Sequence, residues 1–299
     1  MNKLEVSIGI PAYNEAKNIK KVLSGILAQN QEGWKLKEIF VICDGCTDKT
    51  AEKAREVESK ELIVLEDGLR KGKTKRLNEL FKMVKGEILI MFDGDIGCAN
   101  KNVITTLLKP FENKKVALVG GNSQPYRPKT FVEKAVYSTF TVFYESRKKL
   151  KKGHNVFGAT GSILAARTAF VKPIIIPKVV SEDAYLYLYC ISKKYLFRYV
   201  DEAVIYYKLP SNFKDYFKQV LRSAPVSVTT EMYPHFGTRA YKEFKRPAGF
   251  YVQQIFTAFM QNPVGVIVIV ALNIVARPLQ KLVIKNYKLD WFTAHSTHN

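Results

Sequence analysis

The first 95 residues alternate between short apolar runs and segments with helical periodicity. Apolar runs predict four strands, at residues 6–10, 38–43, 61–66 and 87–92. Helices are expected between them, at about 15–29, 47–60 and 73–84. Because uninterrupted β-rich runs that alternate with helices are typical of a mostly parallel sheet covered on both faces, we expect an α/β fold with a Rossmann-like sheet.

The pattern changes beyond residue 115. It predicts a strand at 116–121, a helix at 129–152, a pair of strands at 195–200 and 203–208, and a helix at 211–223. No internal repeat or low-complexity linker divides this part of the sequence. We therefore assign residues 1–230 to one α/β domain and residues 231–299 to a separate C-terminal region.

Polar motifs directly follow three of the predicted strands. PAYNE (11–15) follows the first strand, DGCTD (44–48) the second and DGD (93–95) the fourth. Ligand sites in such sheets lie beyond the carboxyl ends of the strands. We therefore expect the three motifs to meet at one edge of the sheet.

Asp93 and Asp95 flank Gly94 at the end of an apolar strand, where carboxylates need a function or a partner. Residues two apart in an extended segment project to the same face, and glycine lets the backbone approach a ligand closely. The pair suits Mg²⁺ or Mn²⁺ held by one or two carboxylates and completed by substrate phosphates. The alternative is a plain turn, in which Asp and Gly are common.

The second motif combines thiols with acids. Cys43 and Cys46 have the CxxC spacing of a metal or redox site, and they alternate with Asp44 and Asp48. Asp48 precedes a helical pattern and is a plausible capping acid, whereas Asp44 is better placed to contact a ligand. Four cysteines are too few to form a disulfide framework in this chain, so a reducing, cytosolic location fits.

The charge narrows the class of partner. The 299-residue chain has a net charge of +20, so we expect an anionic partner such as nucleotide phosphates, nucleic acid or an acidic membrane surface. Nucleic acid is not expected, because the sequence has no recognition motif and its aromatic residues form no stacking platform. The N-terminus lacks the apolar segment of a signal peptide, so we expect the chain to begin with a strand.

The order PAYNE, DGCTDKT, GKTKRLN (72–78), DGD, GATGS and SED resembles the family 2 glycosyltransferases, which have the GT-A fold. The resemblance covers roughly residues 5–225. It implies transfer of a sugar from a nucleotide-sugar, with inversion, using a divalent metal. Cys46 stands where the family usually has serine, which indicates that the acids matter and the thiols are incidental.

The resemblance implies a role for each matching residue. Asp95 would bind the metal, and Asp183 of the SED motif would be the general base on the acceptor hydroxyl, with Glu182 in support. Such a base contributes about 10²–10⁴-fold in rate, and a phosphate acceptor would need it much less. The residues expected to bind the nucleotide-sugar are Pro11, Tyr13, Glu15, Asp44, Lys73 and Asp93.

Gln219 and Arg222 resemble the Gln-x-x-Arg-Trp motif of membrane-embedded polysaccharide synthases, but Ser223 replaces the tryptophan. The two residues lie three apart, on one face of the predicted helix, and Arg222 would bind the diphosphate. The alternative is an ordinary amphipathic surface helix. Without the tryptophan and a long transmembrane array, we do not expect processive synthesis.

Residues 247–276 carry no charge. A transmembrane helix needs about 20 apolar residues, but Asn262-Pro263 divides this segment into two shorter halves. Basic residues flank both ends, which favours keeping both on the cytoplasmic side. We therefore expect a re-entrant or interfacial hairpin rather than a single crossing. A buried core or subunit-interface helix pair is the alternative.

Together these features predict a metal-dependent inverting hexosyltransferase at the cytoplasmic face of the cell membrane. We expect a nucleotide-sugar donor, with a UDP-sugar favoured, and a lipid or lipid-linked acceptor. Within the class, the rival is a polyprenyl-phosphate hexose synthase, which has a phosphate acceptor. From other classes, the alternatives are a nucleotidyltransferase, a basic nucleic-acid-binding protein and a non-catalytic membrane scaffold. The sequence does not predict the oligomeric state.

Overall fold

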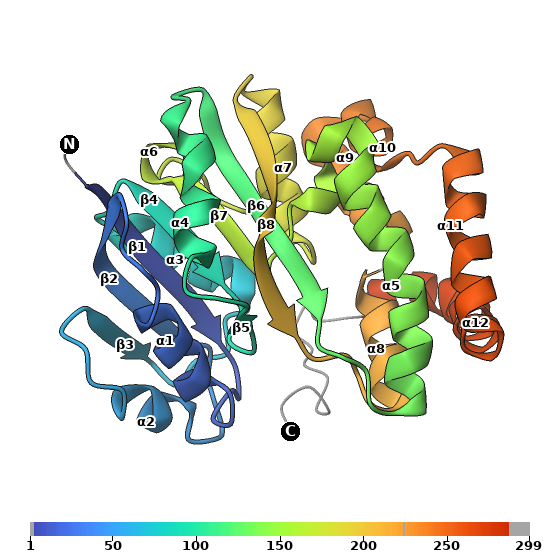
Figure 1. Cartoon of the computed structure of the whole chain (residues 1–299), viewed down its shortest axis with the longest axis horizontal. Helices are drawn as coiled ribbons and strands as arrows, with labels where there is room; N and C mark the ends of the chain where they lie inside the picture. Colours follow the sequence, from blue (N-terminus) through green and yellow to red (C-terminus); the bar gives the residue numbers. More distant parts are fainter. Residues whose placement is uncertain (1–2, 224, 287–299) are drawn as a thin grey trace.

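A computed structural model describes residues 3–223 and 225–286 (Figure 1). Within these residues, the centre of the molecule is one eight-stranded sheet in the order β3-β2-β1-β4-β7-β6-β8-β5. One half is parallel and consists of β1 (Leu4–Ala12), β2 (Trp34–Cys43), β3 (Leu62–Glu66) and β4 (Ile88–Phe92). The four strands predicted in the first 95 residues are therefore confirmed.

The other half of the sheet is mixed. It consists of β7 (Ile163–Arg167), β6 (Val116–Pro125), β8 (Leu196–Tyr207) and the short β5 (Gly97–Cys98). β7 is antiparallel to both β4 and β6, and β6 is parallel to β8. β7 therefore joins the two halves at the centre of the sheet.

The prediction of two paired strands at 195–200 and 203–208 is wrong, because β8 runs through both as one strand. The polar residues Asp201 and Glu202 interrupt the apolar pattern without ending the strand. The pairing with β6 shifts between Gly120 and Asn122, and the side-chain amide of Asn122 donates to the Asp201 carbonyl at 2.8 Å. The irregularity is thus absorbed by a bulge, with no hairpin turn.

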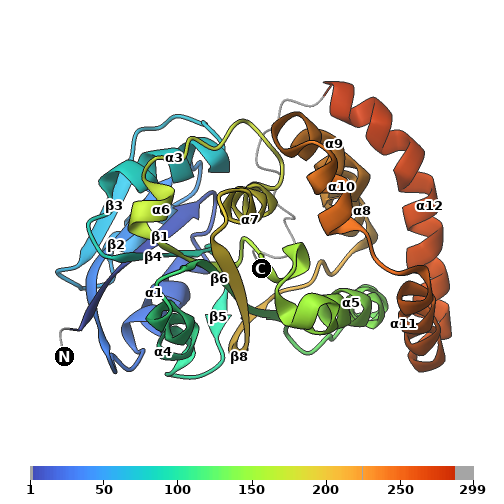
Figure 2. The same cartoon turned by 90° about the horizontal axis from the view of Figure 1, so that it is seen from above.

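Helices cover both faces of the sheet (Figure 2). On one face lie α1 (Ile19–Leu27), α2 (Thr50–Arg55) and α4 (Val103–Leu108), and on the other α3 (Lys73–Met83), α6 (Thr168–Val171) and α7 (Glu182–Ser192). β4 shows why both faces are apolar, since Ile90 packs on the first face and its neighbours Leu89 and Met91 on the second. The expected α/β sheet covered on both sides is confirmed.

A second group of helices lies beside the sheet (Figures 1 and 2). It consists of α5 (Phe131–Lys149), α8 (Phe213–Ser223), α9 (Pro225–Phe236), α10 (Thr238–Phe244), α11 (Ala248–Gln261) and α12 (Pro263–Asn286). Short 3₁₀ turns occur at Lys109–Glu112, Leu150–Gly153 and Val156–Gly158. α12 contacts both α5 and α8 through a small core of Ala135, Tyr216 and Ile269.

The uncharged segment 247–276 contains the whole of α11 and about the first half of α12. The predicted break at Asn262-Pro263 is confirmed, because α11 ends at Gln261 and α12 begins at Pro263, a residue favoured at the first helical position. Among the helices of the described residues, none has the length and apolar character needed to cross a membrane. Membrane association of this segment stays a prediction.

Candidate active site

The loops that follow β1 and β2 are joined by hydrogen bonds. The backbone N–H of Thr47 donates to the side-chain oxygen of Asn14 at 2.8 Å. The carboxylate of Asp48 accepts the N–H of Ala16 at 3.1 Å and that of Thr50 at 3.0 Å, at the start of α2. The structure thus brings the PAYNE and DGCTD motifs together. The expected capping role of Asp48 is wrong, because the N-cap residue of α2 is Lys49 and no side chain caps the helix; Asp48 instead joins the loop after β1 to the start of α2.

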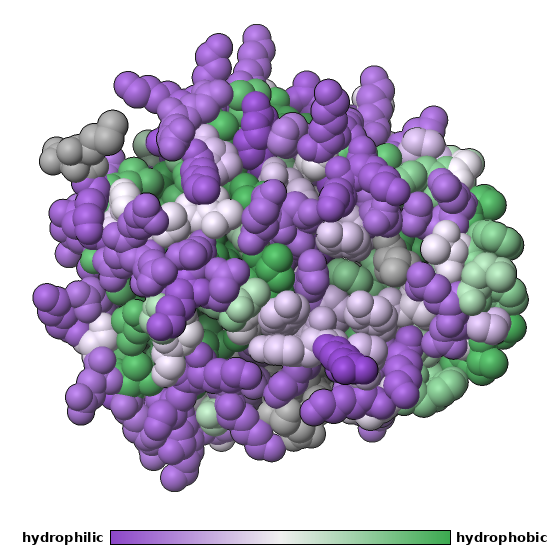
Figure 3. All heavy atoms as spheres, in the orientation of Figure 1, coloured by the Kyte–Doolittle hydropathy of each residue, from purple (hydrophilic) through white to green (hydrophobic). Residues whose placement is uncertain are grey.

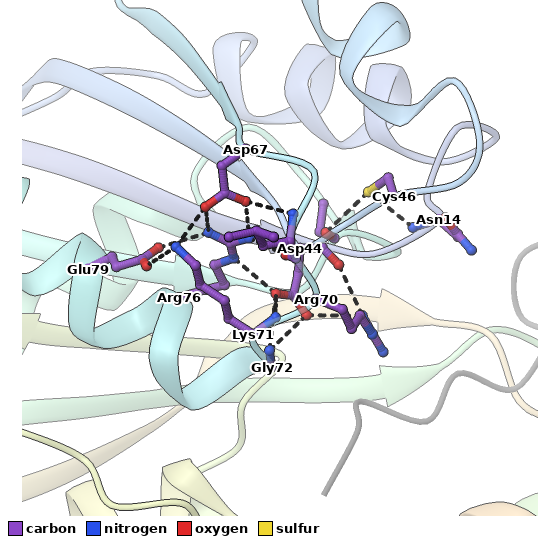
Figure 4. Close-up of polar contacts among 11 residues, drawn as sticks. Asn14, Asp44, Cys46, Asp67, Arg70, Lys71, Gly72, Arg76 and Glu79 are labelled. Atoms are coloured by element: carbon purple, nitrogen blue, oxygen red, sulfur yellow. Dashed lines mark hydrogen bonds and ion pairs between the residues drawn. The ribbon is translucent and has the colours of Figure 1, made fainter. Parts of the chain in front are cut away.

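Asp44 is fully buried at the end of β2 and its oxygens are saturated by donors (Figure 4). They accept the side chains of Arg76 at 2.9 Å and Arg70 at 3.0 Å, and the backbone N–H groups of Lys71 and Gly72 at 2.8 and 3.0 Å. In this arrangement Asp44 fixes the loop that leads into α3. The expected binding of the nucleotide-sugar by Asp44 stays a prediction.

The guanidinium of Arg76 is the centre of a larger charge cluster (Figure 4). Besides Asp44, it binds Asp67 at 2.7 Å and Glu79 at 3.0 Å. Hydrogen bonding to Arg76, supported by Lys71, holds the pKa of Asp67 well below its usual range. The cluster ties β2, the loop after β3 and α3 into one unit beneath the candidate site.

Arg70 also lies against an aromatic ring of the first motif. Its guanidinium carbon is 3.2 Å from the centre of the Tyr13 ring. A cation over the face of a tyrosine is attracted by the ring quadrupole. The side chain of Arg70 therefore connects Tyr13, predicted to line the nucleotide pocket, to Asp44.

Lys73, the first residue of α3, binds two carboxylates that are distant in the sequence. Its ammonium lies 2.6 Å from Asp93 at the end of β4 and 2.7 Å from Glu182 at the start of α7. Burial alone would lower the pKa of Lys73, but these two carboxylates raise it above its ordinary value. A protonated lysine thus lies between the DGD and SED motifs.

Gly94 allows Glu15 to approach the DGD motif. A Cβ atom at Gly94 would lie 2.8 Å from Cγ of Glu15. Glu15 is buried and accepts a hydrogen bond from the side-chain amide of Asn18 at 2.8 Å. The PAYNE and DGD motifs therefore meet as predicted, and the glycine is needed for the close packing of a carboxylate against the turn.

Asp95, the residue predicted to bind the metal, is half-buried at the same end of the sheet. Burial raises the pKa of Tyr207, at the end of β8, and the negative charge of Asp95 adds to this rise against the opposing charge of Arg147. Asp95 therefore lies within electrostatic range of the end of β8.

Asp183 is held at the start of α7 by hydrogen-bond donors. Its carboxylate accepts the backbone N–H groups of Gly161 at 2.9 Å and Ala184 at 2.7 Å, and also the hydroxyl of Ser181. These three donors fix the position of the carboxylate at the start of α7. Burial raises the pKa of the neighbouring Glu182, and the negative charge of Asp183 raises it further. The ammonium of Lys73 acts in the opposite direction and lowers it.

A small cavity lies where these motifs converge. Five of the residues that line it belong to the sequence motifs, and they are Pro11, Lys73, Gly161, Glu182 and Asp183. The rest of the lining is apolar and consists of Leu77, Met91, Phe92, Leu164 and Leu186. The structure thus brings together residues of the PAYNE, GKTKRLN, GATGS and SED motifs around this cavity. Pro11 contributes to the wall of the cavity from β1.

The QxxR element belongs to the group of helices beside the sheet. Gln219 and Arg222 belong to α8, which contacts α9 and α12 and lies at the end of the molecule where β8 ends (Figure 1). Gln219 is half-buried, and the side chain of Arg222 lies outside the described part of the structure. Their predicted contact with the diphosphate stays a prediction.

Cys43 and Cys46 are both free thiols, and Cys43 is fully buried. Hydrogen bonding to Cys43 lowers the pKa of Cys46 to about 7, although burial opposes this. The Cys46 thiol also accepts the N–H of Asn14 at 3.5 Å. Among the described residues, no cluster of three or more Cys, His, Asp or Glu residues is arranged to hold a metal.

Sequence reasoning missed three basic residues of the site. Arg70 and Arg76 hold Asp44, and Arg147 of α5 donates to the Ser123 carbonyl at 2.7 Å near the end of β6. Arg70 lies two residues before the recognised GKTKRLN motif, and Arg76 lies within it. The sequence spacing of Arg76 and Glu79 was the one signal for their ion pair, since residues three apart on a helix are neighbours.

The family model "Glycosyl transferase family 2" matches residues 7–174. The chain therefore belongs to glycosyl transferase family 2. The match begins in β1 and extends past β7, so it includes the PAYNE, DGCTD and DGD motifs.

Two curated relatives are glycosyltransferases. The glycosyltransferase AglE of Haloferax volcanii is 30% identical over 138 residues, which are 46% of this chain and 45% of the relative. The poly-beta-1,6-N-acetyl-D-glucosamine synthase of Staphylococcus aureus is 24% identical over 244 residues, which are 79% of this chain and 57% of the relative. The chain thus spans about half the length of these two relatives.

A solved structure has the same fold. The mannosyltransferase PcManGT from Pyrobaculum calidifontis, in complex with GDP-Man and Mn²⁺, superposes with a TM-score of 0.61 at 17% identity. The alignment covers 96% of this chain and 82% of that protein, so the likeness includes the helices beside the sheet. The GT-A architecture expected from the motifs is confirmed.

Proposed function

We propose that this chain transfers a hexose from a nucleotide-sugar to a hydroxyl group of a lipid or lipid-linked acceptor, with inversion, at the cytoplasmic face of the membrane. A UDP-sugar is the favoured donor, and a GDP-sugar is the second candidate because the mannosyltransferase of the same fold was solved with GDP-Man. The observation that carries the proposal is that the ammonium of Lys73 pairs with both Asp93 and Glu182. Lys73 and Glu182 also line a small cavity, together with Asp183.

The donor would lie along the loops after β1, β2 and β4. Pro11, Tyr13 and Glu15 would line the nucleotide pocket, while Asp44 shapes the loop beside it. Asp93 would face the ribose, with Lys73 supplying positive charge next to the diphosphate. In this proposal Gln219 and Arg222 of α8 would reach the diphosphate from the acceptor side.

The residues fit a divalent metal that is held largely by its substrate. Mg²⁺ and Mn²⁺ sites of this kind use one or two carboxylates together with substrate phosphates. Asp95 would supply such a carboxylate, and the phosphates of the nucleotide-sugar would complete the site. When bound, the metal would neutralise charge on the leaving diphosphate.

Asp183 would remove the proton of the acceptor hydroxyl. The N–H groups of Gly161 and Ala184 orient its carboxylate, and the cavity adjoins it. Glu182 would act through Lys73, since the two form an ion pair of 2.7 Å. In this proposal the loops after β1, β2 and β4 would bind the donor, and Asp183 of α7 would accept the proton.

The phosphate-acceptor alternative differs in its need for Asp183. A polyprenyl phosphate is already ionised and requires no general base, so Asp183→Asn would then leave transfer intact. The product would also break down in mild acid, because a glycosyl phosphate is labile. The SED motif favours the hydroxyl acceptor.

The test is sugar transfer by the full chain to membrane lipid extract, with radiolabelled UDP- and GDP-sugars and Mn²⁺. We expect Asp95→Asn to lose metal-dependent transfer and Asp183→Asn to lose transfer to hydroxyl acceptors, while the surface variant Glu52→Gln behaves as the wild type. Full activity of either site variant would remove that residue from its role. Release of pyrophosphate would instead indicate a nucleotidyltransferase.

A further inference from the structure

Helices α11 and α12 present a large apolar face to the solvent. Between residues 247 and 276 the chain has no charged side chain. The most exposed apolar residues of this face, each 58–67% exposed, are Val252, Phe256, Met260, Val264, Ile267 and Ile274. They form the outer edge of the molecule, where the space-filling view shows apolar residues concentrated (Figure 3). We call these six residues the α11–α12 face.

The opposite sides of both helices are already occupied. Ala258 of α11 and Ile269 of α12 are buried, and α12 packs on α5 and α8. The side chain of Asn273 donates to the hydroxyl of Tyr216 at 2.9 Å, which fixes the rotation of α12 about its axis. The α11–α12 face therefore cannot turn inward without breaking this packing.

The attachment of α11 to the catalytic half is also fixed. Arg246, just before α11, lies with its guanidinium carbon 4.1 Å from the centre of the Phe157 ring and 5.1 Å from that of Phe143. Phe157 belongs to the turn that precedes the Gly161 loop. The face is thus held in a fixed position relative to the candidate active site.

The size and composition of the face indicate an apolar partner. Contiguous exposed apolar patches larger than a few hundred Å² are rare on monomeric proteins and mark interaction surfaces. Water-facing helices usually place charged residues on the exposed side, but α11 contains none. A surface of this kind is removed from water when another protein or a lipid covers it.

Charge decides between these two partners. Lys242 and Lys245 are exposed immediately before α11, and the sequence places Arg277, Lys281 and Lys285 in the second half of α12. A second copy of a chain with a net charge of +20 would bring these basic ends together, which is unfavourable. An anionic lipid surface complements both the apolar face and its basic ends.

We propose that the α11–α12 face docks on the surface of an anionic lipid bilayer, with the helices lying in the interface and not crossing it. α11 has 14 residues, fewer than the roughly 20 that a span requires. Apolar helix faces with basic flanks insert to the level of the headgroup and acyl boundary. The proposal deepens the proposed function, on which the use of a lipid acceptor rests, but binding and transfer can be measured separately.

The experiment is cosedimentation of the full chain with vesicles of phosphatidylcholine, alone or mixed with phosphatidylglycerol. We expect binding to the anionic vesicles, weakened by salt, and little binding to the neutral ones. The triple variant Phe256→Ser, Met260→Ser, Ile267→Ser should lower affinity for anionic vesicles by about tenfold or more. The matched control is Ile175→Ser, which alters an apolar residue that is 74% exposed outside this face and should bind as the wild type.

A second variant, Met260→Asp, keeps the test valid if the triple variant does not fold, because Met260 is 67% exposed and outside the core. It should also lose vesicle binding while the melting temperature stays unchanged. Wild-type levels of binding in folded variants, or no binding by the wild type, would overturn the proposal. Concentration-dependent dimerisation that the variants abolish would identify a second copy as the partner and would equally overturn it. Nucleotide binding serves as the independent readout of the catalytic site.

Discussion

The ammonium of Lys73 lies 2.6 Å from the carboxylate of Asp93, which makes the first residue of α3 the direct partner of the DGD motif. The same ammonium binds Glu182, so one positive charge separates two carboxylates that would otherwise repel each other. Lys73 therefore lies at the boundary between the parallel strands of the sheet and the helix that carries Asp183.

Lys73→Met tests this role. Removing one partner of a buried ionic cluster leaves carboxylates uncompensated, so we expect a loss of about 3–5 kcal/mol in the free energy of unfolding, measured in urea. Nucleotide-sugar affinity should fall with it, because the diphosphate loses its positively charged neighbour. Lys75→Met is the control, since Lys75 is exposed on the same helix. Equal stability of the two variants would contradict the prediction.

Glu182→Gln tests the energetic cost of the buried carboxylate. Because burial raises the pKa of Glu182 above its ordinary value of 4.5, its contribution to stability is full below pH 4.5 and is lost as the pH rises through the raised pKa. The variant keeps a side-chain oxygen that can accept from Lys73. We therefore expect similar melting temperatures of the two proteins below pH 4.5 and a more stable variant at neutral pH.

Melting curves of both proteins across this pH range supply the measurement. The difference between them isolates Glu182 from all other titrating groups. A difference that does not change with pH, or a wild type that is more stable at neutral pH, would show that the carboxylate is ionised in the fold without penalty.

Gly161→Ala should disturb the site more than the fold. The added Cβ would lie 2.9 Å from the Lys73 ammonium and 3.0 Å from a Glu182 oxygen, both at the ends of flexible side chains. These ends can move, so we expect the melting temperature to fall by only a few degrees, equivalent to about 1 kcal/mol. Sugar transfer should fall more strongly. Gly25→Ala in α1 is the control, because its Cβ would meet no atom within 4 Å.

Arg76→Leu should destabilise the protein by about 3–5 kcal/mol in urea unfolding, because it removes the cation shared by Asp44, Asp67 and Glu79. Arg55→Leu provides the comparison. Arg55 is half exposed, and its 3.3 Å ion pair with Glu66 belongs to a class that contributes only about 0–1 kcal/mol. Similar losses in the two variants would mean that the cluster around Arg76 does not stabilise the fold.

The parallel half of the sheet could be predicted because its central strands are buried on both faces. The run at Ile88–Phe92 is continuously apolar for that reason, and each polar motif begins where such a run ends. β7 was not predicted, because its sequence, Ile163–Arg167, is short and rich in alanine. Its position depends on pairing with β4 and β6, which no local pattern reveals.

The site could be predicted only in part, because contacts between distant segments also decide which of its residues meet. The resemblance selected Lys73, Asp93 and Asp183 individually, and their convergence results from the sheet order. The partners of Asp44 were not foreseen, since which of several basic residues meets a buried acid is decided by the path of the chain between β3 and α3. The membrane role of residues 247–276 was inferred from the lack of charge, but the separation into a buried and an exposed side became visible only in the packing on α5 and α8.

The antiparallel pairing of β4 with β7 has a consequence for how such enzymes diversify. Phe92 pairs with Ile163, so the ladder between the strands, and not the length of chain between them, sets Asp93 beside the Gly161 loop. Residues between β6 and β7 can therefore be inserted, lost or exchanged at the surface while the register is preserved. A change of length in this surface segment would therefore leave the distance between Asp93 and the Gly161 loop unaltered.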